Sequence, residues 1–243
     1  MMSPRNPITI ITIKTAPSEE RKPICASERP QPDASPFLDK IEKLSYTLLK
    51  SATSFRLLQV VSGDDDSLLE CKMFEADLNG ADTPNYIALS YSWDDENLPD
   101  TLHPILVNGT IFEIKRNLWN FLQNYRCTTG ERIIWMDQIC INQADLGERS
   151  TQVQLMSKIY KQASMDLFWI GEPDEHTEAA MDLAAKLSRM WKALLRSELD
   201  TNPSPDSLHD PIHMLLSGLP TFPSAPWESL MHLLSRRCFR RAW

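Results

Sequence analysis

The segment from Arg132 to Gln152, RIIWMDQICINQADLGERSTQ, constrains the fold more than any other part of this 243-residue chain. A short apolar run ends at the acid Asp137, and a polar loop rich in amide and carboxylate side chains follows. Gly147 then precedes a pattern typical of a helix that begins near Glu148. The order predicts a buried strand, a loop and a helix. Because open α/β sheets bind ligands beyond the carboxyl ends of their strands, the segment also predicts the functional site.

Strand and helix patterns alternate through the middle of the chain. Asn108 and Gly109 separate two β-rich runs between Ile105 and Ile114, which is the strongest short-range signal of a hairpin. The alternation predicts an α/β fold, with a mostly parallel sheet, helices on its faces and an antiparallel edge formed by the strands nearest the N-terminus. The other predicted strands are 55–61, 68–78, 86–91, 133–136 and 167–170, and the predicted helices are 116–126, 148–163, 180–194 and 227–236.

The N-terminal part of the chain differs in composition from the rest. Residues 1–45 are rich in proline and polar side chains, which predicts a disordered segment. Within it, the run from Ile8 to Ile13 is strand-like but has no predicted partner. Residues 46–243 are predicted to form the folded domain, with the core motifs in residues 86–171.

Several functional classes are disfavoured by charge and composition. The net charge of −8 argues against broad binding to nucleic acid. No apolar run approaches the ~20 residues that span a bilayer, and no secretory signal opens the chain. Five scattered cysteines, with Cys140 between two isoleucines, predict reduced thiols in a cytoplasmic protein. His209 and His213 alone do not make a metal site, and the glycine-rich loops that bind nucleotide cofactors are absent.

Two carboxylates stand out as candidate catalytic groups. Asp145 and Glu148 have the spacing of a capping box, so Glu148 is either a helix cap, a carboxylate facing a ligand, or both. Loss of a cap alone costs about 0.5–2 kcal/mol. Asp137 follows a buried strand and must be solvated, hydrogen-bonded or paired, for which Arg132 and Arg149 are candidates.

A second cluster of aromatic and polar side chains ends another predicted strand, and two amides lie in the loop after Asp137. Ser90, Tyr91 and Trp93 end another strand, where the two rings either wall a pocket for a flat ligand or pack in the core. Asn142 and Gln143 lie in the loop after Asp137, where capping of turns is the default role of asparagine.

Several separated motifs resemble the fungal heterokaryon incompatibility (HET) family. They are YIALSYSW, ILVNGTIFEIKRNL, IIWMDQICINQADLGERSTQVQLMSKIYKQA and LFWIGEPD, in that order along the chain. The upstream FRLLQVVSG and LLECKMFEADL and the closing SRRCFRRAW extend the resemblance to about residues 55–243. In the family the last motif continues beyond its tryptophan, whereas this sequence ends at Trp243, so we expect a domain truncated at its C-terminal end.

The resemblance implies a role in fungal non-self recognition and programmed cell death. HET domains are regarded as distant relatives of TIR domains, which have flavodoxin-like α/β folds and in some cases cleave NAD. By that analogy NAD is a substrate and no resident cofactor is expected. Glu148 is then the first candidate and Asp137 the second for the carboxylate beside the ribose. The substrate-binding candidates are Ser90, Tyr91, Trp93, Asn142, Gln143 and Arg149.

Two alternatives to catalysis stay open. The domain can signal without chemistry, through homotypic assembly or other protein partners, or it can be an inactive member of the family. An open, aromatic-lined cleft beside a carboxylate would favour the enzyme.

Overall fold

The computed structural model describes residues 8–10, 44–63, 67–93, 101–126, 130–197 and 218–240. Contacts divide the chain into two compact units, Met1–Gly171 and Glu172–Trp243, and each unit is described by itself. Most of the segment predicted to be disordered lies outside the described residues. The single folded domain over 46–243 stays a prediction.

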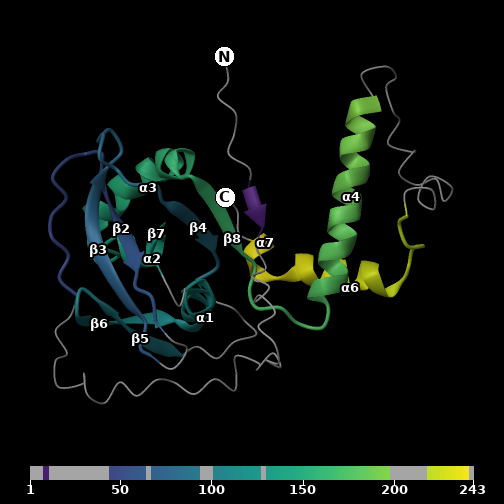
Figure 1. Cartoon of the computed structure of the whole chain (residues 1–243), viewed down its shortest axis with the longest axis horizontal. Coiled ribbons are helices and arrows are strands. Elements are labelled where there is room, and N and C mark those ends of the chain that lie inside the picture. Colours follow the sequence, from purple (N-terminus) through teal and green to yellow (C-terminus); the bar gives the residue numbers. More distant parts are fainter. Residues whose placement is uncertain are drawn as a thin grey trace. The chain divides into compact units, whose positions relative to one another are not determined.

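The first unit is built on a mixed sheet, with eight strands among its described residues (Figure 1). The strand order across the sheet is β1-β8-β4-β7-β2-β3-β5-β6. The strands are β1 (Ile8–Ile10), β2 (Ser54–Val60), β3 (Glu70–Asp77), β4 (Ile87–Tyr91), β5 (Leu102–Val107), β6 (Thr110–Lys115), β7 (Arg132–Trp135) and β8 (Met165–Trp169).

The α/β class with flanking helices and antiparallel early strands is confirmed, but the sheet is mixed and not mostly parallel as predicted. Strands β8, β4 and β7 are parallel to one another. Strand β1, for which the sequence predicted no partner, pairs with β8, also in parallel. Strand β2, however, is antiparallel to both β7 and β3 and lies inside the sheet. Its side chains are buried at six of seven positions, BBBBBiB, which suits an interior strand.

The Asn-Gly hairpin is confirmed. Strands β5 and β6 are antiparallel, and Val107 pairs with Thr110 across the turn. Asn108 and Gly109 have φ of 53° and 78°, so both adopt the left-handed conformation that a type I′ turn requires. Asparagine and glycine are the residues that tolerate this conformation, which is why the sequence signal was specific.

Helices cover the two faces of the parallel part of the sheet. Trp135 and Trp169 point to opposite faces, because they pair in register with Ala88 and Tyr91, three positions apart on β4. Tyr160 contacts the Trp135 ring edge to face at 5.4 Å, and Phe121 meets Trp169 in the same way at 5.6 Å. The helices of this unit are α1 (Arg116–Tyr125), the single turn α2 (Asp137–Cys140) and α3 (Leu146–Gln162), and α2 was not predicted.

The second unit consists of helices α4 (Thr177–Ser197), α6 (Ala225–Ser235) and α7 (Arg237–Arg240). Asp174, just before α4, accepts hydrogen bonds from Thr177 Oγ1 at 2.7 Å and from Arg236 at 2.8 Å. Burial alone would raise the pKa of Asp174, but these hydrogen bonds lower it to about 2. The carboxylate therefore joins the start of α4 to the end of α6.

The buried histidine of the first unit makes its stability sensitive to acid. His103 on β5 is 2% exposed and stacks on Trp119 at 4.8 Å. Burial, with a smaller contribution from Arg116, lowers the pKa of His103 below its ordinary value of 6.5. The folded state thus favours the neutral ring, so the stabilisation is complete above about pH 6.5 and is lost as the pH falls through the lowered pKa.

We expect the thermal midpoint to fall between about pH 7 and about pH 5, and to fall less in His103→Gln, which stays neutral throughout. Thermal melts of both proteins at each pH measure this difference. An equal fall in the two proteins would assign the acid sensitivity to other groups.

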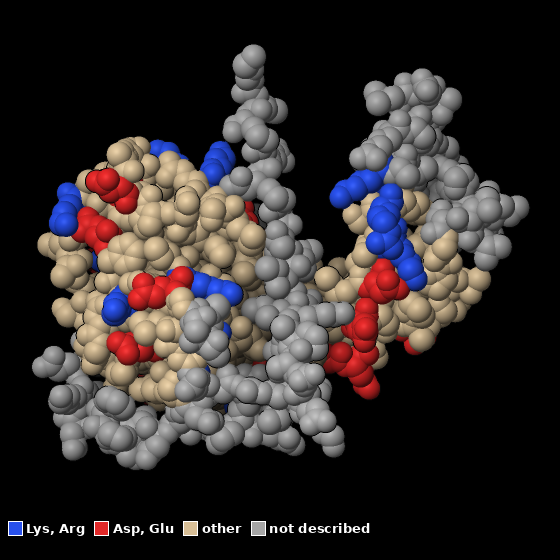
Figure 2. Space-filling view, in the orientation of Figure 1, with Lys and Arg blue, Asp and Glu red and all other residues tan. Residues whose placement is uncertain are grey.

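The surface offers two further observations. On the first unit, acidic and basic side chains are interspersed over the face seen in Figure 2. Within the described parts of the chain, no helix combines the length and apolarity needed to cross a bilayer.

Candidate functional site

Two predicted clusters meet at the carboxyl ends of β4 and β7. These strands are parallel neighbours, so the residues that follow them lie side by side. Trp93 Nε1 donates a hydrogen bond to Asp137 Oδ1 at 2.9 Å, and the Tyr91 hydroxyl donates to Gln138 Oε1 at 3.0 Å. We call Tyr91, Trp93, Asp137 and Gln138 the strand-end site.

The members of the strand-end site differ in exposure. Asp137 and Trp93 are half-buried, whereas Tyr91 is only 2% exposed. Burial first, and then the charge of Asp137, raises the pKa of Tyr91 well above its usual value, so its hydroxyl stays a donor. The ring of Tyr91 belongs to the core, and Trp93 is the aromatic side chain with an accessible surface at this site.

Asn117 on α1 ties the end of β4 to the end of β8. Its Nδ2 donates to the Ser92 carbonyl at 2.6 Å, and its Oδ1 accepts from Trp169 Nε1 at 2.8 Å. The side chain is buried, so these bonds satisfy groups that would otherwise be costly. Asn117 was not among the predicted site residues, although an asparagine on the apolar face of a helix is a usable signal.

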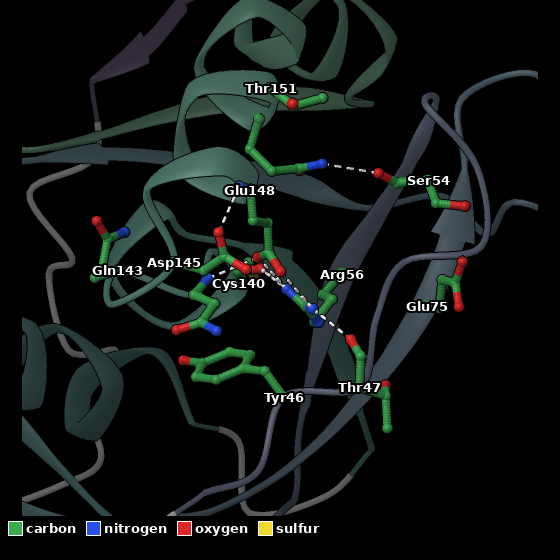
Figure 3. A network of polar contacts seen from close by, with 12 residues as sticks. Tyr46, Thr47, Ser54, Arg56, Glu75, Cys140, Gln143, Asp145, Glu148 and Thr151 are labelled. Atoms are coloured by element: carbon green, nitrogen blue, oxygen red, sulfur yellow. Dashed lines mark hydrogen bonds and ion pairs between the residues drawn. The ribbon is translucent and has the colours of Figure 1, made fainter.

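Glu148 does not stand free beside the strand-end site; it forms a buried ion pair with Arg56 of β2 (Figure 3). Arg56 donates from its two terminal nitrogens to Oε1 at 2.5 Å and Oε2 at 2.9 Å. The Asn142 backbone N–H donates to Oε1 at 2.7 Å. The side chains of Arg56 and Glu148 are 3% and 10% exposed, so the carboxylate is largely occupied.

Strand topology explains why Arg56 lies there. In the antiparallel register of β2 and β7, Leu58 pairs with Ile134, so Arg56 comes opposite the residue after β7. Its guanidinium also donates to the Cys140 carbonyl at 3.2 Å and to the Thr47 carbonyl at 2.7 Å. Arg56 was not among the predicted site residues, and its only signal in the sequence is a lone arginine in the apolar run FRLLQVV.

The capping role predicted for the start of α3 is confirmed in part. Asp145 is the N-cap, and its Oδ1 accepts from the backbone N–H groups of Gly147 at 2.9 Å and Glu148 at 3.0 Å. Glu148, however, bonds the N–H of Asn142 instead of that of Asp145. The reciprocal half of the capping box is therefore redirected into the loop.

The other predicted loop residues serve local structure. Asn142 Oδ1 accepts from the Ala144 N–H at 3.2 Å, the turn-capping bond expected of asparagine. Gln143 Nε2 donates to the Asp137 carbonyl at 2.8 Å. Ser90 is half-buried within β4, and Arg149 is exposed on α3.

The cysteines and the potential metal ligands form no reactive or metal-binding group among the described residues. Cys140 is buried, and burial raises the pKa of its thiol to about 12, so it is not a ready nucleophile. Cys71, Cys140 and Cys238 are free thiols in the described residues. Among those residues, no three His, Cys, Asp or Glu side chains are grouped so as to hold a metal ion.

An open cavity of about 370 Å³ lies away from the predicted site residues. It is lined by residues of β2, β3 and their flanking loops, including Lys50, Glu75 and Asp77. Asp77 accepts hydrogen bonds from Ser51 at 2.6 Å and Thr53 at 2.9 Å, so its carboxylate already has partners.

The fold and the strand-end site define an α/β domain with a carboxylate held beside an aromatic ring where parallel strands end. The model of the family described as "Heterokaryon incompatibility protein (HET)" matches residues 86–243. The chain therefore belongs to the HET family.

The chain is also similar to "Heterokaryon incompatibility protein 6, OR allele" from Neurospora crassa, with 30% identity over 160 residues. The similar part covers 60% of this chain and 23% of the relative. No solved structure matches the chain.

Proposed function

We propose that this chain acts as an effector of heterokaryon incompatibility, in which recognition of non-self between fungal cells leads to cell death. Membership of the HET family supports this role, as does the similarity to a Neurospora crassa protein named for heterokaryon incompatibility. Since the similar part covers 23% of that relative, the proposal concerns the action of the domain itself.

We propose further that the strand-end site cleaves the nicotinamide–ribose bond of NAD. The observation that carries this proposal is the hydrogen bond from Trp93 Nε1 to Asp137 Oδ1 at 2.9 Å. It holds a carboxylate next to an aromatic side chain at the carboxyl ends of parallel strands, where α/β sheets bind ligands. A ring of the substrate can stack on Trp93, and the carboxylate can lie beside the ribose.

The main contribution that this reaction requires from the protein is electrostatic stabilisation of the transition state. The bond from the ribose C1′ to the pyridinium nitrogen breaks, and its electron pair leaves with neutral nicotinamide. Water adds its oxygen to C1′ and releases a proton, which gives ADP-ribose. The transition state resembles an oxocarbenium ion, and a nearby carboxylate stabilises that charge.

We assign the carboxylate role to Asp137 in preference to Glu148. The charge of Glu148 is offset by Arg56, and three N–H groups already bond its two oxygens. A carboxylate that is neutralised and hydrogen-bonded in this way would stabilise a developing cation only weakly. A catalytic role for Glu148 stays a prediction.

The variant Asp137→Asn tests the assignment. It removes the charge but keeps an oxygen for the Trp93 hydrogen bond, so we expect the fold to persist. Nicotinamide release by the purified chain should fall by about 100-fold or more, as is typical when one electrostatic contact to a transition state is lost. Cell death on overexpression in a fungal host should be lost in parallel.

Asp145→Asn is the matched control. It makes the same change eight residues further along, at an exposed N-cap position that asparagine fills well. Release at the wild-type rate is expected from this variant. Equal nicotinamide release by wild type and Asp137→Asn would show that Asp137 takes no part in the reaction.

A second function, assembly without catalysis, is favoured by one observation. The carboxylate of Glu148, which the family resemblance placed first, is occupied by Arg56. If the domain acts by assembly, Asp137→Asn should still cause cell death, and wild type should release no nicotinamide. Light scattering over a range of concentrations would then show a self-associated species.

A further inference from the structure

Arg56 holds the segment that follows β7 at two backbone points. It donates directly to the Cys140 carbonyl, and through Glu148 it fixes the Asn142 N–H. Tyr46 adds a third point, because its hydroxyl donates to the Ile139 carbonyl at 2.9 Å. The Arg56 guanidinium lies over the Tyr46 ring, 4.9 Å from its centre.

The segment held in this way carries the strand-end site. Asp137 and Gln138 begin it, and Gln143 returns to bond the Asp137 carbonyl at 2.8 Å. A shift of Cys140 or Asn142 would therefore move the backbone that aims the Asp137 carboxylate at Trp93. Figure 3 shows Arg56 reaching from β2 towards Glu148, with Tyr46 and Thr47 beside it.

A buried ion pair is a poor source of stability. The desolvation of both charges offsets much of their attraction, so an apolar pair of similar volume is often equally stable. An apolar pair, however, cannot bond the Cys140 carbonyl or the Asn142 N–H. The ion pair therefore contributes directional hydrogen bonds to the backbone, which apolar packing cannot provide.

We propose that Arg56 is a positioning residue, which through Glu148 and the Cys140 carbonyl sets the geometry of the strand-end site. The consequence for catalysis rests on the proposed function of that site. Arg56 and Tyr46 both precede residues 86–243, the part matched by the family model. The functional unit therefore includes β2 and the residues just before it.

The experiment compares wild type with Arg56→Met, Glu148→Leu and the double variant, all in the full chain. Each single variant leaves a buried charge without its partner, so the thermal midpoint should fall sharply. In the double variant, which has neither charge, the thermal midpoint should be close to that of wild type. Hydrogen exchange of the peptide covering residues 138–145 should nevertheless be at least about 10-fold faster than in wild type.

Kinetics supply the second readout. Misplacement of a reacting group by about 1 Å can cost 100-fold in rate, so the double variant should lose about that factor in kcat with little change in KM. Arg56→Lys keeps the charge without the planar fork of donors, and should lie between wild type and the double variant in both exchange and kcat. Arg126→Met, which removes a guanidinium bound to Ser67, should leave exchange of 138–145 unchanged.

The outcomes separate this inference from the proposed function. Faster exchange in a folded double variant supports positioning by Arg56, whether or not wild type releases nicotinamide. Absence of nicotinamide release from wild type would contradict only the proposal of NAD cleavage. Wild-type exchange in the folded double variant would overturn positioning. A double variant that fails to fold would show that the pair serves stability, and wild-type exchange in Arg56→Lys would likewise count against the directional contacts.

Discussion

Replacing Glu148 with alanine is expected to lower the free energy of unfolding by about 3–5 kcal/mol, because Arg56 would keep a buried charge with no carboxylate to meet it. The Asn142 N–H would lose its acceptor as well. Chemical denaturation followed by circular dichroism measures the difference. The expected loss exceeds the 0.5–2 kcal/mol that a helix cap alone would account for.

Asp145→Ala is the control for this result. It removes the N-cap of α3 but leaves the ion pair in place, so about 0.5–2 kcal/mol is expected. Equal losses in the two variants would mean that Glu148 acts as no more than a cap. Toxicity of Glu148→Ala must be compared at equal amounts of folded protein, since instability alone can abolish it.

Replacing Trp135 with alanine is expected to cost about 3–5 kcal/mol through the cavity left in the core. Trp135 is fully buried in β7 and packs edge to face against Tyr160 of α3. Its indole nitrogen has no hydrogen-bond partner in the structure, so the loss is one of packing. The denaturation midpoint measures it.

Trp191→Ala provides the comparison for Trp135. Trp191 is 51% exposed on α4, where truncation should change the free energy of unfolding by about 0.5 kcal/mol or less. Similar effects at the two tryptophans would contradict the assignment of β7 to the interior of the sheet.

Local patterns predicted most of the helices and strands because their signals are contained in a few neighbouring residues. The Asn108–Gly109 turn needs two left-handed residues, and the helical repeat of α1 needs one apolar stripe. The place of β2 in the sheet is different. Nothing within Ser54–Val60 specifies whether its second neighbour is β7 or solvent, so the antiparallel pairing of β2 with β7 in the sheet interior was not predicted.

The strand-end site was predictable in outline for a topological reason. Parallel neighbours end at the same edge of a sheet, so Trp93 and Asp137, each predicted just after or at the end of a strand, come close together once β4 and β7 are adjacent. Arg56 was not expected, because its partner Glu148 lies 92 positions away and is found only through the register of β2 and β7. The single turn α2 is too short to show a periodic pattern.

The interior position of β2 also bears on how the chain is made. On the ribosome, β2 and β3 emerge early and can pair at once, whereas β7, the other neighbour of β2, is synthesised only after β4, β5, β6 and α1. During that interval one side of β2 presents unpaired N–H and C=O groups, the kind of edge that pairs with other chains. Closing so long a loop slows folding, so aggregation competes with it most strongly before residue 135 has been made.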